Sequence, residues 1–407
     1  MILRNTKLFV YAFSLLSAEL YSAFSSIRGV EHNEGDAAYL YYMLLVFAIS
    51  MTFLVFDLPK AFNVKFNKKL LLIPLCFTCF YWYDVFKEGQ VLVWTEKAYK
   101  FHIFFSLPAI LIGGCLTVQG KLFYLYKYMD LLIMFLGIGM LCNLPKMVLT
   151  GGIIEGYQNI SYQAALAFGF IYYGLLTNRE DRFAIFRGKK FKIVSIVLCI
   201  LLTICTLASG GRGGVVFLFV LMFVISFKYV KRSNIYKMLF LYIPILLLSF
   251  SLLASVVRNS VFSRVLDVGM ERAFSYITDE GIDMSQTSNR DEAYELAISE
   301  IKKEPITGKG VFHTIGTTGY PHNLILEITE QGGFVYLTIW LFLFLGMYKR
   351  ARVIYKNEYL FFLIPLFLYP SIMLMFSGTY LTNANFWFFF SVCYSLRHRR
   401  NQIITYN

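Results

Sequence analysis

The chain has 407 residues, of which 57% are hydrophobic and 15% are charged, and its formal net charge is +13. Soluble domains carry about a quarter charged residues, whereas here the apolar residues come in blocks long enough to cross a bilayer, which takes ~20 residues. Composition therefore excludes an ordinary soluble domain and predicts an all-α polytopic membrane protein. Because Lys and Arg collect on the cytoplasmic side of such proteins, the basic excess does not indicate nucleic acid.

The apolar blocks predict about 12 transmembrane helices in one integral membrane domain, residues 1–407. The expected spans are 7–24, 38–57, 69–84, 101–119, 122–142, 159–177, 191–209, 213–230, 236–256, 322–347, 358–376 and 384–396. The first block lacks a signal-peptide cleavage pattern and is expected as a retained helix. Lys and Arg gather at both ends and in alternate loops, which predicts that both termini are cytoplasmic.

A long polar segment, residues 257–320, separates the ninth and tenth spans and is expected on the extracytoplasmic side. Loops of this length are usually functional. Residues 260–277 mix apolar and charged positions like an amphipathic helix at the membrane interface. Residues 279–283 predict a turn, and the pattern Ser288-x-x-Asp291 predicts a capping box that opens a further helix. Pro305 is expected to end that helix.

Two arginines are candidates for binding an anion. Arg290 would lie in the first turn of the capped helix, where free backbone N–H groups also favour anions; the alternative is a solvated surface arginine. Arg212 lies among the glycines of residues 209–214, in a very short outer loop, and no packing need for so many glycines is visible in the sequence. A functional arginine is expected there, and the alternative is an arginine that extends to the lipid headgroups.

The tenth span begins directly after a Gly- and Thr-rich loop that ends in Tyr320, Pro321, His322 and Asn323. A histidine near its ordinary pKa can accept a proton from a sugar hydroxyl or hold that hydroxyl by a hydrogen bond. The alternative is an interfacial histidine in contact with lipid headgroups. The other histidines have weaker sequence contexts.

Several acidic residues fall inside expected spans, where a carboxylate is costly unless paired. Asn323, Glu327 and Glu330 share one face of the tenth helix, so these carboxylates are expected to pair with a loop arginine or to form a purely structural pair. Asp130 follows Lys127 by three residues and is interpreted as its internal partner. The pair Gly332-Gly333 is expected to bend the tenth helix.

No sequence pattern indicates a cofactor or a metal. All seven cysteines lie in or at the edge of apolar blocks, so neither a disulfide framework nor a Cys metal site is expected. His, Asp and Glu show no metal-ligand spacing, and there is no phosphate-binding P-loop. Aromatic residues are numerous and mostly expected in the interfacial belts; a minority near the outer face could stack on sugar rings, but the sequence does not identify them.

The order of these motifs resembles the O-antigen polymerase and O-antigen ligase superfamily (Wzy-like). That family has a short Ser-Arg-Gly loop, a large outer loop with arginines, a P-x-x-G-x-G turn, and His-Asn opening a helix that continues to Gly-Gly. The matching pieces are Ser209 to Gly214, Arg290, Pro305 to Gly310, and His322 through Gly333. The motifs cover about residues 190–350. One departure is the Gly-Gly before Arg212, where the family usually has Ser directly.

The resemblance implies a metal-independent glycosyltransferase on the outer face of the bacterial cytoplasmic (inner) membrane. Its donor would be a glycan on undecaprenyl diphosphate and its acceptor a sugar hydroxyl. Direct attack at the anomeric carbon would invert its configuration, as a single-displacement model expects. The implied catalytic residues are His322, Arg290 and Arg212, and the implied substrate-binding residues are Arg258, Arg264, Asn323, Tyr320 and Glu327. No cofactor is implied; the expected partners are the lipid-linked glycans, the bilayer and a chain-length regulator protein.

Three functions remain in comparison at this point. The leading one is a polymerase that joins lipid-linked repeat units into O-antigen or capsule, in a Gram-negative or Gram-positive host. The nearest alternative is an O-antigen ligase that moves the glycan to lipid A–core, since both share every motif above. A lipid-linked oligosaccharide flippase is the alternative from another class, but a transporter should line its cavity with charge from many spans.

Overall fold

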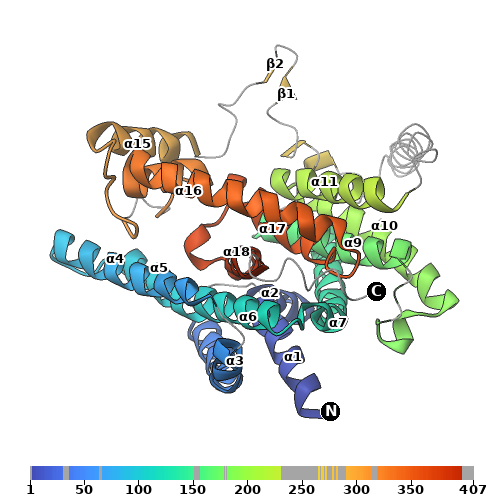
Figure 1. The fold of residues 1–407 in the computed structure, drawn as a ribbon. Coiled ribbons are helices and arrows are strands. Elements are labelled where there is room, and N and C mark those ends of the chain that lie inside the picture. Colours follow the sequence, from blue (N-terminus) through green and yellow to red (C-terminus); the bar gives the residue numbers. More distant parts are fainter. Residues whose placement is uncertain are drawn as a thin grey trace. The chain divides into compact units, whose positions relative to one another are not determined.

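The computed structural model describes residues 2–30, 36–63, 67–150, 156–177, 179, 181–230, 265, 267–269, 271–272, 277–278, 281–282, 290–313 and 319–396. Within these residues all regular elements are helices, apart from one antiparallel pair of short strands (Figure 1). In the described part of the chain, eight helices are long and apolar enough to cross a membrane, or nine spans if the bent pair of helices at the N-terminus is counted as one. The protein is therefore an all-α polytopic membrane protein, as predicted.

The chain forms two compact units. Unit 1 comprises Met1–Ser17, Glu34–Tyr128 and Thr287–Asn407, and unit 2 comprises Ala18–Asn33 and Met129–Gln286. The elements of unit 1 are α1 (Ile2–Leu15), α3 (Ala37–Asn63), the 3-10 helix η1 (Lys68–Leu71), α4 (Leu72–Glu88), α5 (Val93–Phe101), the π-helix η2 (His102–Ser106), α6 (Leu107–Val118), the start of α7 (Leu122–Leu141), α15 (Arg290–Lys303), α16 (Leu324–Lys356), α17 (Leu363–Phe376), the 3-10 helix η6 (Tyr380–Thr382) and α18 (Ala384–Leu396).

The remaining elements belong to unit 2. They are α2, which begins at the unit boundary (Ser17–Ile27), the rest of α7, α8 (Asn143–Leu149), α9 (Tyr157–Thr177), the 3-10 helix η3 (Ala184–Phe186), α10 (Lys189–Ser209), α11 (Arg212–Tyr229), β1 (Ile277–Thr278) and β2 (Gly281–Ile282).

Helix α6 lies in the core of unit 1 and contacts both α18 and α3. Nearly every residue of α6 is buried. A Cβ at Gly113 would lie only 2.7 Å from the carbonyl oxygen of Phe388, so glycine permits the close approach of α18. Ser391 of α18 donates a hydrogen bond of 2.6 Å to the carbonyl oxygen of Ile110. Small residues and a hydroxyl thus join these helices, as is usual between membrane helices.

Helix α9 is the centre of unit 2, where it packs against α10 and α11. One interpretation from the sequence is corrected here. The buried Asp130 of α7 does not pair with Lys127; it receives two hydrogen bonds, of 2.9 and 3.0 Å, from the buried guanidinium of Arg182. Both oxygens of the carboxylate are matched by the planar donor fork of arginine, a geometry that lysine cannot supply.

The helices follow most of the predicted spans. Eight predicted spans correspond to the candidate membrane helices, and 7–24 corresponds to the bent pair α1 and α2. The blocks predicted at 358–376 and 384–396 form the shorter helices α17 and α18, of 14 and 13 residues. The block at 236–256 lies outside the described residues. The count of about 12 spans therefore stays a prediction.

The long segment between the ninth and tenth predicted spans is described in part. The predicted turn at 279–283 coincides with an antiparallel pair of strands, in which Ile277 is opposite Ile282. Helix α15 begins at Arg290 and ends at Lys303, with two lysines in its last turn. The chain turns directly afterwards at Pro305, as predicted. Ser288 of the predicted capping box lies outside the described residues.

Candidate functional site

In unit 1, the turn after α15 is bound to a break in α16. Gly332 and Gly333 have non-helical backbone angles, which confirms the predicted bend. Two carbonyls at the end of the first part of α16, those of Glu330 and Gln331, accept hydrogen bonds of 3.0 and 2.9 Å from the backbone N–H groups of Lys309 and Gly310. The turn thus satisfies carbonyl groups that a helix end leaves unpaired.

The chain also closes on itself on the other side of this break. The N–H of Phe334 donates a hydrogen bond of 2.8 Å to the carbonyl oxygen of Pro305. Gly308 and Gly333 both have positive φ, 68° and 63°, and a Cβ at either position would overlap backbone atoms of the opposite segment. Glycine is therefore required on both sides for close approach as well as for conformation.

The segment that follows the turn is fixed by α4 and α5. The carboxylate of Asp84 accepts a hydrogen bond of 2.6 Å from the backbone N–H of Phe312, and the hydroxyl of Thr95 donates one of 2.9 Å to the carbonyl oxygen of Phe312. The ammonium of Lys87 donates to the carbonyl oxygen of Lys309 at 2.9 Å. Residues more than 200 positions earlier in the sequence therefore hold this loop.

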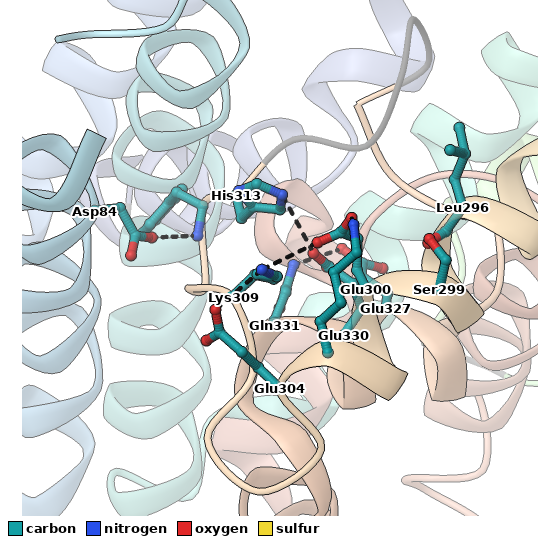
Figure 2. Close-up of polar contacts among 12 residues, drawn as sticks. Asp84, Leu296, Ser299, Glu300, Glu304, Lys309, His313, Glu327, Glu330 and Gln331 are labelled. Carbon is teal, nitrogen blue, oxygen red and sulfur yellow. Dashed lines mark hydrogen bonds and ion pairs between the residues drawn. The ribbon is translucent and has the colours of Figure 1, made fainter. Parts of the chain in front are cut away.

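A cluster of charged side chains lies beside the same turn (Figure 2). The Lys309 ammonium is 3.2 Å from Glu300 and 3.0 Å from Glu304. The hydrogen bond that the ammonium donates lowers the pKa of Glu304, and donating hydrogen bonds to Glu304 and Glu300 raises the pKa of Lys309. The sequence alone did not predict that Lys309, Glu300 and Glu304 lie together.

His313 lies between a buried and a more exposed carboxylate. Its Nε2 is 3.9 Å from Glu330, which is 1% exposed (Figure 2). Its Nδ1 is 3.7 Å from Glu88. Burial lowers the pKa of His313 below its ordinary value, so the imidazole is neutral at neutral pH. The residues around His313 in the sequence did not predict a role for it, because its carboxylate neighbours lie on helices α4 and α16.

Glu327 is buried with neutral partners. Its side chain, 1% exposed, accepts hydrogen bonds from the hydroxyl of Thr379 and, at 3.4 Å, from the amide of Gln331. Tyr380 donates a further bond of 2.6 Å to the Gln331 side chain. The expected arginine partner is not found among the described contacts of Glu327. Its role in binding substrate stays a prediction.

The tenth helix begins at Leu324, two residues after the predicted start at 322, and Asn323 precedes the helix instead of lying on one of its faces. Asn323 is the N-cap of α16, and its side-chain oxygen accepts hydrogen bonds of 3.0 and 3.2 Å from the N–H groups of Ile325 and Leu326. His322 has a φ of 54°, a left-handed conformation that is uncommon for residues other than glycine. Such conformations are concentrated at functional sites. Its ring lies 4.5 Å from that of Tyr320, and both side chains are partly exposed.

Arg212 lies in unit 2 as the first residue of α11. It is partly buried, and its Nε donates a hydrogen bond of 2.9 Å to the carbonyl oxygen of Arg272. The guanidinium of Arg272 itself lies 5.4 Å from the ring of Tyr157. The sequence had pointed to Arg258 and Arg264 in this part of the chain, and both lie outside the described residues.

The glycines around Arg212 do have a packing role, which corrects the expectation that none exists. A Cβ at Gly213 would overlap the hydroxyl of Tyr162, and one at Gly214 would overlap the hydroxyl of Ser161. Gly210 has a φ of 73° and ends α10 in the left-handed conformation. The glycines therefore allow α11 to pack against α9, and they need no ligand to explain them.

The predicted site residues fall into two groups. Tyr320, His322, Asn323 and Glu327 lie together at the start of α16 in unit 1, and Arg212 lies in unit 2. Arg290 begins α15 in unit 1. Among the described residues, no group of three or more His, Cys, Asp or Glu side chains is placed to hold a metal ion.

Comparison with known families identifies the region that carries these residues. Residues 196–341 match the model of a family described as O-antigen ligase. The matched range includes Arg212, Arg290, the turn after α15, and His322, so the predicted resemblance to the O-antigen polymerase and ligase superfamily is confirmed over the segment that carries its motifs. No curated protein and no solved structure matches the chain.

Proposed function

We propose that this membrane protein, which is similar over residues 196–341 to the O-antigen ligase family, is a glycosyltransferase that polymerises lipid-linked oligosaccharide repeat units into a surface polysaccharide. The observation that carries the proposal is that the family match spans both the arginine at the start of α11 and the histidine before α16. A role in the assembly of O-antigen or a related polysaccharide follows from the family; the polymerase activity is our proposal.

The reaction is a single displacement at a sugar carbon. The acceptor hydroxyl oxygen forms a bond to the anomeric carbon of the donor, and the bond from that carbon to the diphosphate oxygen breaks. The leaving polyprenyl diphosphate keeps the electron pair, and His322 takes the proton of the hydroxyl. Attack from the opposite side inverts the anomeric configuration.

Each arginine, taken within its own unit, has a helix position that supports a role in binding the diphosphate. Arg212 is the first residue of α11, which has 18 residues, and Arg290 is the first residue of α15, which has 14. A helix start presents free N–H groups and the positive end of the helix dipole. A guanidinium at that position adds a charge that can stabilise the diphosphate as it leaves.

Contacts within unit 1 support placing this chemistry at one face of the membrane. Segments that the charge pattern assigns to the outer side contact one another: Asp84 and Thr95 bind Phe312, and Thr379 binds Glu327. Segments assigned to the inner side do the same, because Lys7 pairs with Asp57 at 2.7 Å. We therefore place the site on the extracytoplasmic face and both termini in the cytoplasm.

Replacing His322 by alanine tests the proposal. In cells that carry H322A as their only copy, we expect the ladder of lengthened glycans to disappear while the amount of protein in the membrane stays normal. The control is Lys302→Gln, a change of an exposed side chain in the last turn of α15, which should keep the ladder. A full ladder from H322A would overturn the assignment of His322.

The family description favours ligation as the second candidate. A gel of the glycans from a strain that lacks the protein separates the two activities. A polymerase deletion leaves single repeat units on the acceptor, whereas a ligase deletion leaves long polymer that is not attached to lipid A–core. The second pattern would replace polymerisation by ligation as the proposed function.

A further inference from the structure

A row of aromatic rings leads from helix α5 to His322. The ring of Trp94, in the first turn of α5, lies 5.3 Å from the ring of Tyr320, which lies 4.5 Å from that of His322. All three side chains are partly exposed. Trp94 lies outside residues 196–341, so the family match does not cover it.

The loop before His322 is fitted closely to the indole. Gly319 has a φ of 81°, and a Cβ at this position would lie 2.6 Å from Cδ2 of Trp94. Only glycine allows the backbone to approach the ring so closely. The Lys97 ammonium lies 5.8 Å from the centroid of the same ring, which places a hydrogen-bond donor beside it.

We infer that Trp94 and Tyr320 form an aromatic platform that stacks on a pyranose ring of the acceptor glycan and presents its hydroxyl to His322. This inference rests on the proposed function, and it names the side chains that select the substrate. The C–H face of a pyranose is apolar while its rim carries hydroxyls. Rigid aromatic faces with a few polar groups beside them are the usual lining of sites for such ligands.

The platform belongs to the acceptor because of what lies next to it. His322, at the end of the row, takes the proton of the attacking hydroxyl in the proposed reaction, so the sugar stacked beside it carries that hydroxyl. The charge of the donor requires cations, and the arginines proposed for the diphosphate begin α11 and α15. The division is thus between an aromatic acceptor subsite and a cationic donor subsite.

Kinetics of the purified protein in lipid nanodiscs test the inference. With lipid-linked repeat units as donor and acceptor, we expect Trp94→Ala to raise the KM for the acceptor about tenfold while kcat stays within about twofold. Trp94→Phe should restore most of the affinity, because it keeps an aromatic face. Trp82→Ala, which removes a 53% exposed tryptophan of α4, is the matched control and should change neither constant.

A binding measurement that needs no turnover separates this inference from the proposed function. The soluble oligosaccharide of one repeat unit, added without its lipid, should quench the tryptophan fluorescence of the wild type and much less that of Trp94→Phe. If the quenching is identical in both, or if Trp94→Ala lowers kcat without changing KM, the rings only position the loop and the platform is refuted. Quenching that depends on Trp94 in a protein without transferase activity would refute the proposed function and support the platform.

Discussion

The two glycine-rich stretches of the chain solve different packing problems. At the turn after α15, the atoms that exclude a Cβ at Gly308 and Gly333 belong to the backbone of the opposite segment. At the start of α11, the atoms that exclude a Cβ at Gly213 belong to the side chain of Tyr162. A side chain can move or be replaced and a backbone segment cannot, so the first stretch should tolerate no change and the second should be repairable.

This difference also locates the chemistry of each motif. In both stretches the glycines are explained by close packing, without any ligand. The chemically versatile residues of the two regions are polar ones, His322 with its left-handed backbone and Arg212 at a helix start. A glycine-rich motif here indicates where two segments meet, and the polar residue beside it is the better candidate for function.

The largest effect is expected at Gly333. Alanine there combines the cost of a backbone region that is essentially restricted to glycine (φ 63°, ψ −168°), about 1–3 kcal/mol, with overlap between its Cβ and the carbonyl oxygen of Ile306. We expect Gly333→Ala to prevent accumulation of folded protein, measured by size-exclusion chromatography in detergent. Gly89→Ala tests a positive φ without any overlap, because Gly89 has a φ of 67° with nothing within 4 Å, and it should lower the melting temperature only slightly. Equal behaviour of the two variants would show that the approach of the two backbones is not limiting.

A smaller and reversible effect is expected at Gly213. The Cβ of Gly213→Ala would overlap the Tyr162 hydroxyl, and overpacking of this kind costs about 1–3 kcal/mol. Because the obstacle is a side chain, Tyr162→Leu in the same molecule should recover part of the loss. A double-mutant cycle of unfolding free energies should therefore show a favourable coupling. Additive losses would contradict the distinction between the two stretches.

The smallest effect concerns the ion pairs beside the turn. The pKa of Glu304 is lowered in the folded protein, so its pairing with Lys309 stabilises the fold above the unfolded pKa of a glutamate, about 4.3, and this contribution is lost as the pH falls through the lower folded value. Lys309→Gln should cost about 1 kcal/mol or less at pH 7, since the pair is partly exposed. Melting temperatures of the two proteins should converge below about pH 4; a constant difference would mean that the pair does not contribute through its charge.

Local patterns were sufficient for several features of the fold. Apolar blocks predicted most of the membrane helices, Gly332-Gly333 predicted the break in α16, and Pro305 predicted the end of α15. Each of these signals acts over a few residues, through hydrophobic burial or backbone conformation. That is why they could be recognised in the sequence without any knowledge of tertiary contacts.

Contacts between distant residues could not be predicted in this way. Asp130 lies close to Lys127 in sequence but binds Arg182, and Asp84 binds a backbone N–H 228 positions later. Periodicity reports which face of a helix is apolar; it does not report which backbone group or guanidinium meets that face. The same limit kept Trp94 out of the predicted site, since its proximity to Tyr320 and His322 depends on how α5 meets the loop.

The bond between Pro305 and Phe334 has a consequence for how this protein can vary. This hydrogen bond fixes the two ends of the intervening segment, residues 306–333, to each other. Extra residues inserted before His322 would lengthen this segment, and the entropic cost of closing it grows only slowly with its length. Such an insertion would leave α15 and the part of α16 after Phe334 where they are. The segment before His322 can therefore change during evolution, and with it the ligand that is recognised, without a change in the packing of these helices.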